Sequence, residues 1–424
     1  MTTPVRELDL RHVWHPYTQH FHAPAPGVVT RAEGAYLYDD GGRRIFDAIS
    51  SWWVTLHGHA HPVIAAAVSR QARTLEQVIF AGFTHEPAVR LAAALAGLLP
   101  PGLTRVFFSD DGSTAVEVAL KMALQFWTGR GERRPLIAAL EHAYHGDTFG
   151  AMAASARGLF TEPFAGQLFE VARLPDPSAD GAATLAELDR LLDTRGAELA
   201  AVIVEPLLLG AGGMRVWDAS VLRAIRERTA AAGVLLIADE VLTGFGRTGP
   251  HFACARAAVV PDIICLSKGL TGGFLPLGAT VTREEVFAAF LSPDRRRTLF
   301  HGHSYTANPL ACAAALASLS LLDDASARAR EGVECAHRTG LARLAGQPRV
   351  KCCRVLGTMA AFEIDGEQGY LNPIGPELSA YALKEGVLLR PLGNVVYLLP
   401  PYCSTADDLE HAYDVIEQFL EASG

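Results

Sequence analysis

Apolar runs of strand length alternate with helical patterns along most of the chain, and this alternation narrows the folds that the chain can adopt. Continuous apolar runs predict strands that are buried on both faces. Such strands, separated by amphipathic helices, favour an α/β fold with a mostly parallel sheet covered by helices on both sides. The runs are RVFF, LIAAL, AAVIVEP, VLLIADE, DIICLS and PLGATVT, and the helical patterns between several of them are GSTAVEVALKMALQFW, TLAELDRLLDTRG and DASVLRAIRERTAAAG.

The pattern changes near residue 325, which predicts a second domain. A helical pattern, ASARAREGVECAHRTGLARLAG, is followed there by the strand-like runs VKCCRVLG, MAAFEID and VVYLLPP and by a last helix, TADDLEHAYDVIEQFLEA. We therefore expect a smaller α+β domain over 325–424 and the large domain over 56–324. The irregular, aromatic-rich segment 1–55 is assigned to the smaller domain, which is then built from both ends of the chain.

Composition limits the class of protein and its partners. Half of the 424 residues are hydrophobic and 20% are charged, so the chain can bury a large core. A net charge of −9 without any basic run makes nucleic acids and anionic membranes poor partners. We expect no secretory signal, and the most apolar stretch, LACAAALASLSLL, is too short to span a bilayer and predicts a buried helix. Seven cysteines without paired spacing favour a reduced compartment, most simply the cytoplasm.

Two of the predicted strands end in residues that suit one particular cofactor chemistry. Lys268, one of only four lysines, follows DIICLS, and Asp239 lies 29 residues earlier at the end of VLLIAD. Open α/β sheets bind ligands at the carboxyl ends of their strands. Pyridoxal phosphate (PLP) needs an amine that forms an imine and an acid that keeps its pyridine nitrogen protonated. Taken alone, each residue also fits an ordinary role, Lys268 as a solvated surface group and Asp239 as a helix cap.

Three further strand ends carry polar or aromatic side chains. Gly112, Ser113 and Thr114 fall at a predicted helix start after RVFF, where free N–H groups and the helix dipole favour a phosphate. Tyr144 follows LIAAL and is suited to stacking on a cofactor ring, and Glu205 ends AAVIVEP. A plain helix cap and a packed aromatic are the alternatives for single residues, but five strand ends converging on one chemistry favour a PLP site.

The chain resembles the class III aminotransferases of PLP fold type I over nearly its whole length. The motifs are GSTAVEVALK, YHGDTFGAM, VIVEP, DEVLTGFGRTG, LSKGLTGGFLPLGA and HGHSYTANPLACAAA. The resemblance implies a seven-stranded, mostly parallel sheet and a homodimer with shared active sites. It implies three catalytic residues: Lys268 forming the imine, Asp239 at the pyridine nitrogen and Tyr144 stacking on the ring. The other implied cofactor contacts are Gly112, Ser113, Glu205 and, from the neighbouring subunit, the hydroxyl of Ser304.

The ends of the chain resemble one branch of this family. That branch aminates 8-amino-7-oxononanoate to 7,8-diaminononanoate in biotin biosynthesis, with S-adenosylmethionine as amino donor; the matching segments are HVWHPYTQ, DAISSWWVTLHGHAHP, FGRTG and GVLLRPLGNVVYLLPPY. A long substrate with a terminal carboxylate needs apolar and aromatic walls and one bidentate cation, which suits arginine. By this resemblance Arg390 pairs with the far carboxylate, and the pocket includes Tyr17, Trp52, Trp53, Arg247, Gly302 and Tyr397.

Other functions stay open on the sequence alone. A different class III ω-aminotransferase would act on ornithine, 4-aminobutyrate or β-alanine; Tyr17 and the Trp52–Trp53 pair argue against it. Lysine is a conceivable donor in place of S-adenosylmethionine. A PLP racemase or decarboxylase would transfer no amino group. A cofactor-binding regulator without catalysis is disfavoured, since no helix-turn-helix segment is attached.

The sequence departs from the family pattern at two positions, and it contains one histidine motif that suggests a metal site. Asp111 precedes the phosphate-turn glycine, where an ionised carboxylate is unfavourable unless it points away. Ser304 stands where threonine is frequent in the family, which preserves the hydroxyl. The HGHAH run, from His57 to His61, suggests a metal site, but the nearby glycine and proline favour a turn, so we expect no metal.

Overall fold

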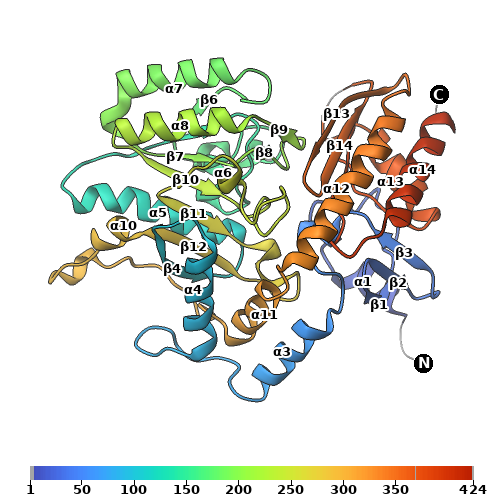
Figure 1. Ribbon diagram of the computed structural model, residues 1–424, viewed down its shortest axis with the longest axis horizontal. Coiled ribbons are helices and arrows are strands. Elements are labelled where there is room, and N and C mark those ends of the chain that lie inside the picture. The colour runs from blue at the N-terminus through green and yellow to red at the C-terminus, as the bar shows by residue number, and fades with distance from the viewer. Residues whose placement is uncertain (1–3, 368, 423–424) are drawn as a thin grey trace.

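The computed structural model describes residues 4–367 and 369–422, and a seven-stranded sheet forms its centre (Figure 1). The strand order is β4-β12-β11-β10-β7-β5-β6. All neighbouring strands are parallel except β12, which runs antiparallel to β11 and β4. The predicted α/β fold is therefore confirmed. The strands are β4 (Leu103–Ser109), β5 (Leu136–Leu140), β6 (Val171–Leu174), β7 (Leu199–Val204), β10 (Leu235–Asp239), β11 (Ile263–Leu266) and β12 (Gly278–Arg283).

Successive residues of the central strands enter two separate cores, one on each face of the sheet. Leu236 and Ala238 of β10 belong to a core that also takes in α4 (Glu86–Leu98) and α8 (Ala219–Ala231). Leu235 and Ile237 belong to the opposite core, which α5 (Gly112–Gly129) covers. This double burial explains why the central strands β5, β7, β10 and β11 are apolar over almost their whole length. The other helices of this domain are α3 (Pro62–Ala72), α6 (Phe149–Ala154), α7 (Gly181–Arg195), α9 (Ala253–Arg256), α10 (Glu284–Ala288) and α11 (Pro309–Leu319). A small antiparallel pair is formed by β8 (Leu208–Leu209) and β9 (Arg215–Val216). The short 3₁₀ turns are η1 (Glu162–Gln167), η2 (Gly196–Glu198), η3 (Lys268–Thr271) and η4 (Arg295–Arg297).

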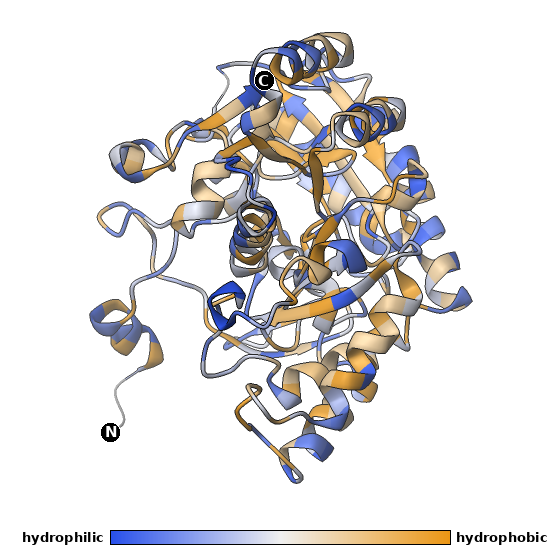
Figure 2. Cartoon of the chain, turned by 90° about the vertical axis from the view of Figure 1, so that its left-hand side faces the viewer, coloured by the Kyte–Doolittle hydropathy of each residue, from blue (hydrophilic) through white to orange (hydrophobic). Residues whose placement is uncertain are grey.

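The second body joins the two ends of the chain. Strand β3 (Arg44–Asp47) pairs in parallel with β15 (Val387–Leu388), and Phe46 lies opposite Val387. These two residues share one apolar core with the last helix, α14 (Ala406–Ala422). The remaining elements are α1 (Val5–His12), β1 (Val29–Glu33), β2 (Tyr36–Asp39), α2 (Ser50–Trp53), α12 (Asp324–Leu344), β13 (Val350–Leu356), β14 (Met359–Ile364), α13 (Ile374–Lys384) and β16 (Val395–Leu398). Helix α1 buries none of its residues and stands at the edge of the body in Figure 2.

The sequence pattern missed strand β6 at the edge of the large sheet. Its four residues, VARL, include Arg173, and none of the apolar runs singled out above covers them. Arg173 is held in place because its guanidinium donates to the backbone oxygens of Ala153, Ala154 and Ser155. Pairing with β5, rather than local apolarity, therefore makes this segment a strand.

The apolar stretch LACAAALASLSLL forms helix α11 as predicted, and most of that helix is buried. Within the described ranges, no single helix is long and apolar enough to cross a membrane. Helices α11 and α12 pass that test only as a pair, on length and composition, and they are bent by 76° where they meet.

We expect acid to destabilise the protein through His337. Its ring is buried between the Tyr413 hydroxyl (2.9 Å) and the Thr358 carbonyl (3.0 Å), and burial lowers the pKa of His337 to about 4. Between pH 6.5 and about 4 the His337 ring binds a proton in the unfolded chain but not in the folded chain. Stability should therefore fall by about 3 kcal/mol as pH drops through this window.

Urea unfolding at pH 7 and pH 4.5 checks this expectation. His337→Gln should lose less stability on acidification than the wild type, whereas His12→Gln, at an exposed position, should behave like the wild type. Equal acid sensitivity of His337→Gln and wild type would contradict the assignment.

Candidate active site

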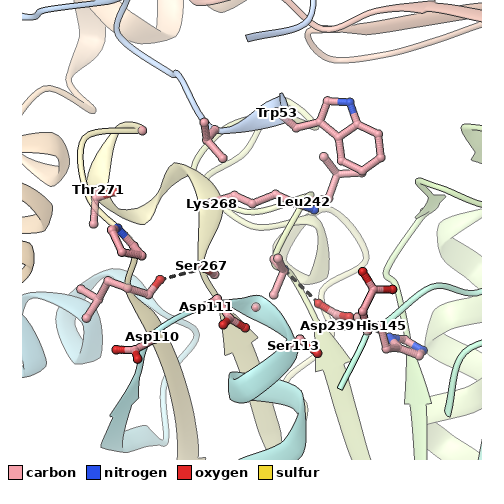
Figure 3. A pocket seen from close by; sticks show the side chains of 18 of the residues that line it. Trp53, Asp110, Asp111, Ser113, His145, Asp239, Leu242, Ser267, Lys268 and Thr271 are labelled. Atoms are coloured by element: carbon pink, nitrogen blue, oxygen red, sulfur yellow. Dashed lines mark hydrogen bonds and ion pairs between the residues drawn. The ribbon is translucent and has the colours of Figure 1, made fainter. Parts of the chain in front are cut away.

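The carboxyl ends of the parallel strands surround a cavity of about 670 Å³, which we call the strand-end cavity. Lys268 follows β11, Asp239 ends β10, and Glu205 follows β7, so the three predicted polar residues do meet. In Figure 3, Lys268 extends across the cavity beneath Trp53, and Ser113 and Asp239 lie on the side facing the sheet. The other predicted wall residues that line it are Gly112 and Tyr144.

Lys268 is held as a buried amine in an uncommon backbone conformation. It begins the 3₁₀ turn η3 with φ +42°, a region that residues other than glycine rarely occupy and that often marks functional sites. Its Nζ lies 4.6 Å from the centroid of the Trp53 ring. Burial lowers the pKa of Lys268, while the carboxylates of Asp239 and Glu205 oppose that shift. A lowered pKa favours the neutral amine that nucleophilic and base chemistry requires.

Asp239 is oriented by a residue that the sequence analysis did not single out. His145 Nδ1 lies 2.7 Å from Asp239 Oδ2, and the Val241 N–H donates to Oδ1 at 3.1 Å. Both side chains are almost fully buried, and the other ring nitrogen of His145 has no partner within the described part of the chain. His145 belongs to the YHGDTFGAM motif, so its place beside Tyr144 was the available signal.

The start of helix α5 lies at the strand-end cavity, where a helix N-terminus favours an anion. Asp111 caps this helix, since its Oδ1 accepts the Thr114 N–H at 2.8 Å, so its carboxylate is engaged by the backbone. Ser113 Oγ accepts the Thr148 N–H at 3.0 Å. A Cβ atom on Gly146, whose φ is +129°, would lie 2.2 Å from Ser113 Oγ, so only glycine allows this close approach. The compact turn suits a phosphate group.

Glu205 is a buried acid between two backbone donors. Its carboxylate accepts the N–H groups of Tyr144 (2.8 Å) and Gly210 (3.0 Å). Burial raises the pKa of Glu205 to about 7, so this side chain can exchange a proton near neutral pH.

A second cavity of about 330 Å³, the aromatic cavity, adjoins the first through Trp53, Tyr144, Asp147 and Lys268, which line both. Arg390 is its cation, and the guanidinium lies 4.9 Å from the centroid of the Trp52 ring. The predicted pocket residues Tyr17, Trp52, Trp53, Arg390 and Tyr397 all line it.

Five wall residues of the aromatic cavity were not predicted: Asp147, Phe160, Ala211, Tyr370 and Leu392. Phe160 stacks edge-on against Tyr370 and Tyr17, with ring centroids 4.8 and 5.7 Å apart. Asp147 accepts a hydrogen bond from the Tyr17 hydroxyl. Nothing in the local sequence of Phe160 or Tyr370 marks them, because they reach the cavity from segments remote from the motifs.

The structure corrects the prediction that Arg247 lines the substrate pocket. Arg247 is 1% exposed and lines neither cavity. Its guanidinium donates to the carbonyls of Pro400 (2.8 Å), Trp53 and Thr55 (both 3.3 Å). Arg247 therefore ties together three chain segments, and burial lowers its pKa. An arginine in a motif gives no sign, from sequence alone, of which groups its five N–H donors will face.

Gly302 and Ser304 lie outside both cavities of their own chain. Both are exposed, and the Ser304 carbonyl accepts a hydrogen bond from Gln77 Nε2 at 2.7 Å. Their assignment to a neighbouring subunit's site stays a prediction.

The histidines of the HGHAH motif lie within hydrogen-bond distance of protein side chains. His59 lies 2.8 Å from Asp47, and His57 lies 3.2 Å from Ser318. In the described ranges no group of three or more side chains could hold a metal ion.

The residues of the strand-end cavity match the functional groups of PLP. Lys268 offers the amine for an aldehyde, Asp239 an acid for a ring nitrogen, and Gly112 and Ser113 a helix start for a phosphate. Tyr144 and Val241 supply cavity walls for a flat ring. Such a set, on four strand ends, has one well-matched ligand chemistry.

Comparison with known proteins agrees with this geometry. The family model described as aminotransferase class-III matches residues 17–420. The chain belongs to the class-III aminotransferases. Members of this family depend on PLP, and an amine transaminase from an uncultivated Pseudomonas species, solved with PLP bound, shares the fold at 31% identity with a TM-score of 0.89, covering 97% of this chain and 99% of that one.

Two further relatives of this aminotransferase share one name with each other. The adenosylmethionine-8-amino-7-oxononanoate aminotransferase of Synechococcus elongatus is 53% identical over 97% of this chain and 98% of its own length. The crystal structure of the protein of that name from Methanocaldococcus jannaschii matches with a TM-score of 0.93 at 33% identity, covering 97% of this chain and 98% of the other.

Proposed function

We propose that this aminotransferase converts 8-amino-7-oxononanoate to 7,8-diaminononanoate in biotin biosynthesis, with S-adenosylmethionine as the amino donor. The aromatic cavity carries the proposal, because it opens on Lys268 and holds one cation, Arg390, among aromatic walls. A long keto acid needs this combination of an apolar channel and a distant carboxylate partner. The names of the relatives from Synechococcus elongatus and Methanocaldococcus jannaschii support the same substrates.

Each side chain then has a defined task. PLP, when bound, supplies an aldehyde that condenses with amines and a ring that accepts electrons. Lys268 Nζ, whose burial favours the neutral amine, takes the proton from the carbon that bears the donor's amino group and later returns a proton to the carbon being aminated. Asp239, fixed by His145, holds a proton at the ring nitrogen. Tyr17, Trp52 and Phe160 exclude water from the substrate chain.

Half-reactions test the donor and the acceptor separately. The PLP-loaded enzyme is mixed with S-adenosylmethionine, lysine or ornithine, and the absorption spectrum is followed until 8-amino-7-oxononanoate is added. We expect a spectral change with S-adenosylmethionine that the keto acid reverses, and parallel initial-rate plots. A response to lysine alone would reassign the donor. A response to ornithine without reversal by the keto acid would assign a different ω-aminotransferase.

Arg390→Met should weaken acceptor binding specifically. Losing a charge-assisted pair to the carboxylate is expected to raise KM for 8-amino-7-oxononanoate about 10- to 100-fold. Steady-state kinetics with each substrate varied in turn measures this effect. Arg31→Met is the matched control, because the Arg31 guanidinium also lies over an aromatic ring (Tyr38, 3.7 Å) yet lines neither cavity. An unchanged KM in Arg390→Met would exclude Arg390 as the carboxylate partner.

We further propose a homodimer whose subunits complete each other's sites. The segments around Gln77 and Ser304 lie together through the hydrogen bond between them. Large apolar side chains in these segments are exposed, a pattern that marks association surfaces: Ile79 (61%), Phe83 (65%), Phe300 (71%) and Tyr305 (62%). Light scattering should give twice the chain mass.

The cytoplasm is the proposed compartment, since all seven cysteines are free thiols.

A further inference from the structure

We propose that a cleft beside Arg330 binds a small carboxylate with an aliphatic body, at a site separate from the catalytic one. The cleft, which we call the Arg330 cleft, has a volume of about 600 Å³ and shares no lining residue with the strand-end or the aromatic cavity. It is formed by the end of helix α4, the segment that leads into α9, and helix α12. Its walls include Leu98, Pro100, His251, Phe252, Val259 and Arg330.

Arg330 is a buried cation without an acidic partner. The residue is 6% exposed, and its Nη1 donates to Ser326 Oγ at 3.2 Å. Its Nε is buried without a hydrogen-bond partner, and no carboxylate in the described ranges forms an ion pair with it. Buried charges in proteins are normally paired, because desolvation without compensation is costly. Arg330 therefore lines the cleft with a charge that no acidic side chain in the described ranges neutralises.

A second buried guanidinium adds to the positive charge at this place. Arg330 and Arg247 both lie against the Tyr402 ring, at 5.6 and 5.3 Å from its centroid. The donors of Arg247 are taken up by three backbone carbonyls, whereas Arg330 has one hydroxyl. His251 adds no further positive charge, since burial and the nearby Arg330 charge both lower its pKa. The ring of Tyr402 offsets only part of the charge.

The backbone at Gly246 packs closely against the Arg330 side chain. Gly246 has φ +103°, and a Cβ atom there would lie 2.8 Å from Arg330 Cδ and Nη1. Glycine at this position thus lets the arginine side chain pack directly on the loop. A guanidinium packed in this way keeps its remaining donors in one orientation, which suits a carboxylate.

The walls of the cleft select the rest of the ligand. Leucine, proline, phenylalanine and valine side chains offer no hydrogen bonds to a hydrated inorganic ion. They do cover an aliphatic chain, whose removal from water favours binding. A carboxylate joined to a short alkyl chain satisfies both the cation and the walls, and octanoate is a suitable probe.

Octanoate binding to the PLP-loaded enzyme tests the proposal by isothermal titration calorimetry. The Arg390→Met variant serves as the background, so that the aromatic cavity offers no carboxylate partner. We expect one octanoate per chain, and we expect Arg330→Met to weaken its binding at least about tenfold. Phosphate keeps the charge and 1-octanol keeps the chain, and each should bind at least about tenfold more weakly than octanoate.

Two further variants separate loss of binding from loss of folding. Ala255→Phe, at an exposed cleft position on α9, should fill the cleft and abolish binding while Arg330 stays in place. Arg338→Met, which removes an exposed arginine of α12 paired with Glu334, should bind octanoate as the background does. Binding that survives both Arg330→Met and Ala255→Phe, or phosphate or 1-octanol binding as tightly as octanoate, overturns the proposal. Turnover is not the readout, so the outcome is independent of the substrate assigned to the active site.

Discussion

Lys268→Ala is expected to reduce turnover by at least about 10⁴-fold, because it removes the amine that both joins the cofactor and moves the proton. The amine is buried beside Asp239 and Glu205, and in the described ranges no other lysine lines the strand-end cavity. Borohydride reduction followed by mass spectrometry should find the cofactor attached to the peptide that contains residue 268 in the wild type and not in the variant.

Lys351→Ala is the control for this experiment. Lys351 forms a surface ion pair with Asp365 at 2.7 Å and lines neither cavity, so its loss should change turnover by less than about twofold. Turnover in Lys268→Ala within tenfold of the wild type, or cofactor attached to another lysine in the wild type, would falsify the assignment.

Asp239→Asn is expected to keep the cofactor but to lower kcat about a thousandfold, since an amide cannot hold a proton on a ring nitrogen as a carboxylate does. The geometry allows a nearly isosteric exchange, because the hydrogen bond from the Val241 N–H to Oδ1 can persist. Stopped-flow spectra of each half-reaction should show the slowing in the proton-transfer step, with substrate binding little changed.

His145→Gln provides a graded comparison with that variant. His145 contacts Asp239 rather than the cavity's reacting groups, so its loss should reposition the carboxylate and give a smaller decrease, about tenfold. The pH dependence of kcat should shift in His145→Gln and stay unshifted in Glu284→Gln, which removes an exposed carboxylate paired with Arg105. If Asp239→Asn turns over at the wild-type rate, the acid is not the partner of the ring.

The central sheet and the strand-end cavity were accessible from sequence because burial on both faces leaves a local signature. Apolar runs such as the one before Asp239 end where the strand leaves the core, so the first polar residue marks the cavity. Strand β6 lacks this signature, because its four residues are only partly apolar and it lies at the sheet edge. Pairing there depends on the neighbouring strand, which a local pattern does not contain.

The partners of individual side chains were the part that sequence could not provide. Arg247 stands in a family motif, yet it faces carbonyls of segments that lie some 150 or more residues away along the chain. The contact of Tyr17 with Asp147 likewise spans 130 residues. Such contacts depend on how the two bodies pack together, and no periodicity records that.

The parallel pairing of β3 with β15 has a consequence for how the protein is made. Strand β3 leaves the ribosome well before its partner, since about 340 residues separate Phe46 from Val387. At roughly 5–20 residues per second, the early strands wait tens of seconds with an open edge. Trp53 and Arg390, which face the same aromatic cavity, come together only after that delay. We expect a nascent chain that lacks its last forty residues to form the large sheet without Arg390 and Tyr397, two walls of the aromatic cavity.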